Sequence, residues 1–181
     1  EALGFVYIEN SDLDLTAGED GIQAQTRLTV SGGNYRIVSG GGSRGKVSSD
    51  TSAKGLKGVG EVLVAGGTFV IDSCDDAIHS NGNVTISGGN LTLSTGDDGV
   101  HADEKVTVSG GEINITESYE GLEGATVDIS GGTVRITASD DGINAAGGAD
   151  QSGFGGWRPG DTFGSSSSYS INISGGVIYV N

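Results

Sequence analysis

Pairs of acidic residues recur along the chain at a nearly constant spacing. Asp75-Asp76 is followed 22 residues later by Asp97-Asp98, and most other repeats carry an acid at the same place. The acids at these positions are Glu19, Asp20, Asp75, Asp76, Asp97, Asp98, Glu120, Asp140 and Asp141. Stacked carboxylates repel one another unless a cation lies between them, and calcium accepts about six to eight oxygen ligands in irregular geometry. The pattern predicts at least one calcium site; the alternative is that Asp-Asp-Gly forms ordinary solvated turns.

A double-glycine corner marks the repeat that carries these acids. It occurs at Ser31-Gly32-Gly33, Ala65-Gly66-Gly67, Ser87-Gly88-Gly89, Ser109-Gly110-Gly111, Ser130-Gly131-Gly132 and Ser174-Gly175-Gly176, at spacings of 34, 22, 22, 21 and 44 residues. The two excess lengths fall in residues 39–51 and 146–168, whose Gly, Ser and Asp content predicts surface loops. The sequence therefore reads as about six coils of 22 residues with two insertions, which is typical of a solenoid.

Within each coil the apolar residues alternate over three short runs, which is the period of a β-strand. In the third coil the inward set is Ile78, Val84, Ile86, Leu91 and Leu93. The next two coils give Val100, Val106, Val108, Ile113 and Ile115, then Leu122, Val127, Ile129, Val134 and Ile136. We predict an all-β, single-stranded parallel β-helix with three short strands per coil. A β-sandwich would need longer runs and hairpin turns, and a propeller blade would need about twice this period.

Composition limits the classes of function. The 181 residues suit one domain spanning 1–181, long enough to bury a continuous core. The net charge of −15 argues against nucleic acid and against anionic membrane surfaces as partners. The single cysteine, Cys74, rules out an internal disulfide framework, and its corner position predicts a small packed residue rather than a nucleophile. No apolar run reaches the length of about 18 residues that a membrane span needs.

Both ends of the chain read as open coils. The chain starts at Glu1, and Val6–Glu19 aligns with Val84–Asp97, so it enters in the middle of a coil. Ile171–Asn181 aligns with Val84–Ser94 and has no evident cap. Because open coils expose strand edges and core, we expect either a piece of a longer secreted protein or end-to-end self-association.

A second column of polar residues lies one step past a buried aliphatic in each coil. Its members are Gln23, Lys57, His79, His101, Glu123 and Asn144. Alternation predicts that they point outward, beside the acidic turns, with small residues following them. Such a ridge could bind an extended glycan, or it could be an ordinary solvated face. Stacked histidines without a cysteine or a third histidine are weak evidence for zinc.

Two further positions affect the prediction of the site. Lys54 interrupts the acidic column, where an ion pair with Asp76 could replace a metal. Trp157, the only tryptophan, lies in the second insertion, where it could stack on a sugar ring or cover the edge of a coil. The candidate glycan-binding residues are Lys57, His79, His101, Glu123 and Trp157.

The ordered set of turns resembles a bacterial carbohydrate-binding β-helix family. The motifs that carry the resemblance are Gly-Glu-Asp-Gly-Ile-Gln-Ala, Lys-Gly-Leu-Lys-Gly, Cys-Asp-Asp-Ala-Ile-His-Ser, Gly-Asp-Asp-Gly-Val-His-Ala, Ser-Tyr-Glu-Gly-Leu-Glu-Gly and Ser-Asp-Asp-Gly-Ile-Asn-Ala. The resemblance implies a right-handed β-helix similar to pectate lyases, with bound calcium. It further implies a secreted or cell-surface protein that binds plant cell-wall polysaccharides such as cellulose and acidic pectin.

Three functions are compatible with these features. The favoured one is a non-catalytic carbohydrate-binding module in which calcium holds the turns and could bridge to uronate carboxylates. The second is a calcium-dependent polysaccharide lyase, which needs a base beside the metal; Lys57 borders the acids, but Arg27, Arg36 and Arg135 fall on other strands. The third is a structural spacer or adhesin stalk on the cell surface.

Overall fold

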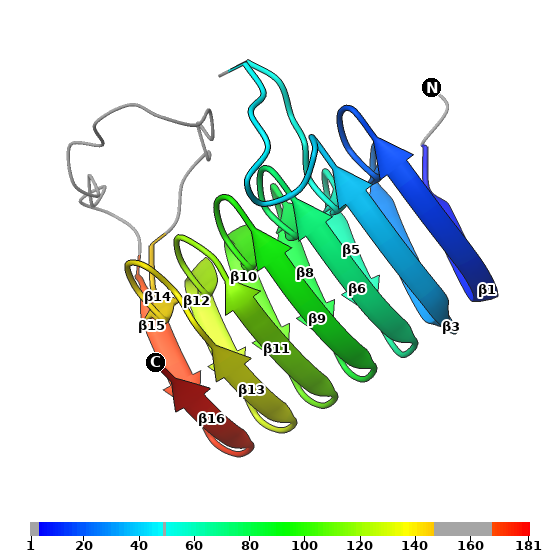
Figure 1. The fold of residues 1–181 in the computed structure, drawn as a ribbon. Helices are drawn as coiled ribbons and strands as arrows, with labels where there is room; N and C mark the ends of the chain where they lie inside the picture. The colour runs from blue at the N-terminus through cyan, green and yellow to red at the C-terminus, as the bar shows by residue number, and fades with distance from the viewer. Residues whose placement is uncertain (1–3, 49, 147–167) are drawn as a thin grey trace.

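The computed structural model describes residues 4–48, 50–146 and 168–181 of the chain. Within these ranges all the regular structure is β, and the strands stack coil upon coil in one solenoid of about six turns (Figure 1). Every strand pair is parallel. The predicted parallel β-helix is confirmed. None of the described residues belongs to a helix that could cross a membrane.

Equivalent strands of successive coils form three strand columns. The first strand column holds β2 (Ile22–Ala24), β4 (Leu56–Gly58), β7 (Ile78–Ser80), the leading parts of β10 (Val100–Val108) and β12 (Leu122–Ile129), and β14 (Ile143–Asn144). The second holds the leading parts of β1 (Val6–Ala17) and β3 (Arg27–Ser39), β5 (Glu61–Val64), β8 (Asn83–Ile86), the trailing parts of β10 and β12, and β15 (Ser170–Ile173). The third holds the trailing parts of β1 and β3, β6 (Thr68–Ser73), β9 (Asn90–Thr95), β11 (Glu112–Glu117), β13 (Thr133–Ile136) and β16 (Val177–Val180).

The core is a set of aliphatic stacks that run along the solenoid. Val84 pairs with Val106 and Leu91 with Ile113, so residues about one period apart lie in register on neighbouring coils. All fifteen inward residues predicted for the three central coils are at most 1% exposed. Because equivalent inward positions of successive coils hold valine, isoleucine or leucine, each coil packs against a neighbour with the same arrangement of aliphatic side chains.

The double-glycine corners need glycine for a conformational reason. The second glycine of each corner has a positive φ between 84° and 113° in every coil: Gly33, Gly67, Gly89, Gly111, Gly132 and Gly176. At Gly111 a Cβ would lie 2.9 Å from Gly89 O and 3.0 Å from Gly88 C. Two constraints therefore favour glycine at this position: the backbone is left-handed, and the closely stacked corners leave no room for a side chain. Together they explain why this glycine recurs in every coil.

The first insertion and the chain ends follow the predicted positions. Residues of the first insertion dock on the third strand column, where the backbone N–H of Ser43 donates to Asp72 Oδ1 at 2.6 Å. Most of the second insertion, including Trp157, lies outside the described residues. The first and last coils align as predicted, since Val6 pairs with Leu28 and Val127 pairs with Ile171.

The last described coil leaves apolar side chains exposed. Its Ile171, Ile173 and Val180 are 43%, 55% and 51% exposed, whereas their counterparts in central coils are buried. End-to-end association, which would cover these side chains, stays a prediction.

Replacing Gly111 with alanine should destabilise the solenoid. The left-handed φ costs a residue with a Cβ about 1–2 kcal/mol, and the close backbone contacts add to this cost. We expect Gly111→Ala to lower the free energy of unfolding by about 2–4 kcal/mol, measured by urea denaturation.

Gly18→Ala provides a matched control. Gly18 has no left-handed φ, and its Cβ would meet no heavy atom within 4 Å. We expect this variant to stay within about 1 kcal/mol of the wild type. An equal loss in both variants would contradict the stacking argument.

Candidate functional site

The polar column predicted beside the acidic turns exists in the first strand column. Strand register places Gln23 beside Lys57, Lys57 beside His79, and His79 beside His101. The column continues through Glu123 to Asn144. The alignment of these residues across six coils was therefore correct.

The predicted exposure of this column was wrong for its central members. His79 and His101 are each only 2% exposed, and Glu123 is 7% exposed. The imidazole rings stack on each other with centroids 5.0 Å apart and planes 11° apart, so each ring covers one face of the other. The acidic turn three residues earlier also folds back onto each ring. These side chains point away from the core but do not reach solvent.

In three of the turns, the second acid accepts a hydrogen bond from the backbone of a neighbouring coil. Asp76 Oδ1 accepts a hydrogen bond from the N–H of Asp98 at 3.0 Å, and Asp98 Oδ1 accepts one from the N–H of Glu120 at 3.2 Å. In the same way Asp20 Oδ1 accepts from the N–H of Lys54 at 2.9 Å. A buried carboxylate that accepts backbone hydrogen bonds offsets part of its desolvation. These bonds link successive turns along the acidic column.

Lys54 lies buried between two of the acids. Its ammonium is 2.9 Å from Asp75 Oδ1 and 2.9 Å from Asp76 Oδ2, and its side chain is 5% exposed. The geometry confirms the predicted ion pair with Asp76. Burial opposes ionisation of Asp76, but the charge of Lys54 and a hydrogen bond from His79 outweigh it and lower the pKa of that carboxyl. Burial and the neighbouring charge of Asp76 raise the pKa of Asp75.

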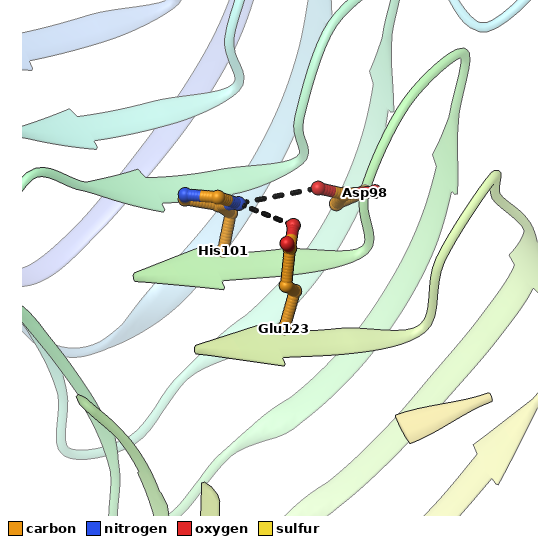
Figure 2. A group of neighbouring side chains, drawn as sticks. All are labelled: Asp98, His101 and Glu123. Atoms are coloured by element: carbon orange, nitrogen blue, oxygen red, sulfur yellow. Dashed lines mark hydrogen bonds and ion pairs between the residues drawn. The ribbon is translucent and has the colours of Figure 1, made fainter. Parts of the chain in front are cut away.

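His101 is the centre of a second group, the His101 cluster, formed by Asp98, His101, Asp103 and Glu123. Figure 2 shows the carboxylates of Asp98 and Glu123 both directed at one nitrogen of the ring. His101 Nδ1 is 2.8 Å from Glu123 Oε2 and 3.2 Å from Asp98 Oδ2. On the other side of the ring, His101 Nε2 is 3.2 Å from Asp103 Oδ1.

The carboxylates around His101 alter its electrostatics. Burial opposes the charged ring, but hydrogen bonds to Asp103, Asp98 and Glu123 outweigh it and raise the pKa of His101 well above its ordinary value. Burial and the charge of Asp76 raise the pKa of Asp98 well above its ordinary value, against the hydrogen bond from His101. Burial opposes ionisation of Glu123 too, but hydrogen bonds with His101 and Asp98 lower its pKa. The protonation of His101, Asp98 and Glu123 is therefore linked, because each side chain changes the pKa of the others.

The predicted metal ligands separate into different environments. Among the described residues, Asp75, Asp76 and Asp97 place carboxylate oxygens within 4.8 Å of one another, and Asp98, His101 and Glu123 form a second such group. Glu120 is buried, and its Oε1 accepts from Asn144 Nδ2 at 3.0 Å. Glu19, Asp140 and Asp141 are exposed and belong to neither group. Asp20 also belongs to neither group, and its Oδ2 lies 3.2 Å from Lys57 Nζ.

The Asp75, Asp76 and Asp97 group has the chemistry of a calcium site but already contains a cation. Its donors are all carboxylate oxygens, which suit calcium. However, the ammonium of Lys54 contacts Asp75 and Asp76, so calcium would have to compete with it or bind on the side of Asp97. The donor set fits calcium in kind, and Lys54 limits how many of these oxygens a metal can use.

Sequence reasoning missed Asp103 as part of the site. Asp103 comes two residues after His101, and strand alternation places both side chains on the same outward side. Its Oδ2 also accepts from Asn81 Nδ2 at 3.2 Å, one coil away. The 22-residue offset between Asn81 and Asp103 was the signal that could have revealed this contact.

These features define a parallel β-solenoid with a ladder of buried acids and histidines along one corner. The chain belongs to the family of carbohydrate-binding domain-containing proteins, whose family model matches residues 1–99. No curated protein and no solved structure gave a match to the chain. The family supports a carbohydrate-binding role.

Removing Lys54 should leave two buried carboxylates without their ammonium partner. Breaking one side of a buried ion pair costs about 3–5 kcal/mol, so we expect Lys54→Met to lower the free energy of unfolding by that amount at pH 7. Lys105→Met is the control, because Lys105 and Asp128 form an exposed pair whose loss should cost at most about 1 kcal/mol.

The effect of Lys54→Met should shrink in acid. In the wild type the pKa of Asp76 lies below its ordinary value of 3.8, so the stability that it contributes is present above that pH and is lost below it. In the variant, burial without Lys54 should raise this pKa and reverse the slope. Urea denaturation at pH 7 and pH 4 tests this; a pH-independent difference would contradict it.

Proposed function

We propose that the chain is a non-catalytic binding module for plant cell-wall polysaccharides, with cellulose or polygalacturonate as ligand. The match of residues 1–99 to a carbohydrate-binding domain family carries this proposal. The resemblance of the turn motifs to secreted bacterial proteins supports a location outside the cell or on its surface as part of this proposal. The solenoid supplies long, regular faces suited to an extended polymer.

Because the central residues of the first strand column are buried, we propose that the carbohydrate contacts a different strand column. With His79 and His101 2% exposed, the outward residues of the third strand column are better placed to touch a polymer. Register aligns Thr92, Asn114, Arg135 and Tyr179 on four successive coils. Figure 1 shows their strands β9, β11, β13 and β16 side by side. Strands about 4.8 Å apart give this row a regular spacing along the solenoid.

Tyr179 and Arg135 form the most distinctive part of this row. Tyr179 is 51% exposed, and the guanidinium of Arg135 lies 4.9 Å from the centroid of its ring. An exposed aromatic ring offers a flat apolar surface for a sugar ring, and the cation beside it suits a uronate carboxylate. The pair supports binding of neutral or acidic polysaccharides.

The environment of Lys57 supports a non-catalytic role over a lyase. A lyase needs a base near the acids, and Lys57 is the nearest candidate from the sequence. Its ammonium is 3.2 Å from Asp20 Oδ2 and 2.8 Å from Ser52 Oγ. An ion-paired ammonium does not accept a proton from substrate. Release of unsaturated oligogalacturonides, followed by ultraviolet absorbance, would overturn this choice.

Calcium is proposed as a stabiliser of the acidic turns and as a bridge to uronates. The carboxylate oxygens of Asp75, Asp76 and Asp97 support this part of the proposal. A protein with a net charge of −15 repels a polyanion, so bridging cations would allow polygalacturonate to approach.

The third-column surface can be tested by affinity electrophoresis and by pull-down with insoluble cellulose. Tyr179→Ala should weaken retention by about 5–30-fold, corresponding to the loss of about 1–2 kcal/mol of aromatic contact. Thr85→Ala, on the second strand column, is the control and should bind like the wild type. Absence of retention by the wild-type chain on any of these polysaccharides would favour a structural spacer.

The calcium proposal has its own test. Because a ligand that binds only the folded state stabilises it, millimolar calcium should raise the melting temperature, and EDTA should reverse the shift. Polygalacturonate binding should disappear in EDTA, whereas cellulose binding should persist. An unchanged melting temperature would remove calcium from the proposal without affecting carbohydrate binding.

A further inference from the structure

The His101 cluster has a feature that an ordinary ion-pair network does not need. Two carboxylate oxygens approach the same ring nitrogen: Glu123 Oε2 at 2.8 Å and Asp98 Oδ2 at 3.2 Å from His101 Nδ1. A protonated Nδ1 has a single N–H, which can point well at only one of them. Asp98 is fully buried and Glu123 is 7% exposed, so water is a poor substitute donor.

The opposite side of the ring indicates which nitrogen would bind a metal ion. Asp103 Oδ1 lies 3.2 Å from His101 Nε2, and a carboxylate accepts hydrogen bonds, so Nε2 carries a hydrogen. Asp103 is itself held by Asn81, whose Nδ2 donates to Oδ2 at 3.2 Å. In the neutral ring the lone pair of Nδ1 then points at the two carboxylates. A carboxylate on the far nitrogen is the usual arrangement behind a metal-ligating histidine.

The remaining ligand atoms are also held in place. Asp98 Oδ1 accepts the backbone N–H of Glu120 at 3.2 Å, which leaves Oδ2 directed at the histidine. His101 and Glu123 lie on the paired strands β10 and β12, and the ring of His79 stacks against His101. Figure 2 shows the convergence of the three side chains. The three candidate donor atoms lie within 4.8 Å of one another.

We propose that Asp98, His101 and Glu123 form a binding site for a divalent transition-metal ion, with Asp103 as the positioning residue behind His101. One imidazole nitrogen and two carboxylate oxygens form a donor set for ions such as Zn²⁺ rather than an all-oxygen calcium site. Ligand atoms of a tetrahedral zinc ion lie about 3.3 Å apart, close to the observed N–O separations of 2.8 and 3.2 Å. A single ion would contact all three donors at once, in place of the protons that otherwise join His101, Asp98 and Glu123.

This site is distinct from the proposed calcium group and does not depend on carbohydrate binding. The calcium group uses Asp75, Asp76 and Asp97, whose partner is the ammonium of Lys54. The His101 cluster includes a nitrogen donor, so the two groups should differ in metal preference. Zinc binding can therefore be measured in the presence of millimolar calcium and without any polysaccharide.

The direct test is nitrogen-15 NMR of the two histidines in the tag-free chain, which has only these two. One equivalent of Zn²⁺ should shift the Nδ1 resonance of His101 to a metal-bound value while Nε2 keeps its hydrogen. His79 serves as the internal control and should change little. An unmoved His101 resonance at saturating zinc would overturn the proposal and identify the cluster as a buried ion-pair network only.

Variants test the separate roles by isothermal titration with Zn²⁺ in millimolar calcium. Glu123→Gln and His101→Gln should weaken zinc binding more than 100-fold, and Asp103→Asn should weaken it about 10–100-fold. Glu112→Gln, an exposed acid on β11, is the control and should bind like the wild type. Equal zinc affinity in Glu123→Gln and the wild type would contradict the site. If a buried variant fails to fold, as circular dichroism would show, the wild-type NMR result decides.

Discussion

In-register parallel pairing of 22-residue coils is the constraint on which the rest of this structure depends. It places each residue about 4.8 Å from its counterpart in the next coil, so every position becomes a column. Columns of valine, leucine and isoleucine pack well and produce a continuous core. Columns of glycine allow the corners to stack. Columns of acid bring like charges together in the same way, and the chain has to compensate for that repulsion.

Several neighbouring groups offset the repulsion between the stacked carboxylates of the acidic corner. Backbone N–H groups of adjacent coils donate to Asp20, Asp76 and Asp98. Lys54 supplies a buried ammonium, and His101 supplies an imidazole between carboxylates. Each compensating group also joins one coil to another. The corner is therefore a structural seam as well as a collection of possible cation ligands.

The acidic corner and the proposed carbohydrate-binding surface are different parts of the solenoid, whereas the sequence suggested one face for both cation binding and glycan binding. The acidic and histidine columns lie side by side, so the sequence predicted an exposed polar ridge next to a calcium site as the place where a glycan would bind. With His79 and His101 buried, the ladder is better suited to holding cations and coils together. The regular, solvent-facing third strand column, with Arg135 and Tyr179 at its last coils, is then the surface that we propose for carbohydrate binding.

The sequence by itself determined the period, the alignment of coils, the inward aliphatic residues and the pairing of Lys54 with Asp76. These follow from periodicity, because register converts sequence offset directly into spatial neighbourhood. Tertiary structure decided the rest. Alternation distinguishes inward from outward side chains, but it does not show whether an outward side chain reaches solvent. That depends on how His79 and His101 stack and on how the turns at Asp76 and Asp98 fold back over them. The convergence of Asp98, Glu123 and Asp103 on His101 likewise depends on side-chain directions across two coils, which residue spacing does not encode.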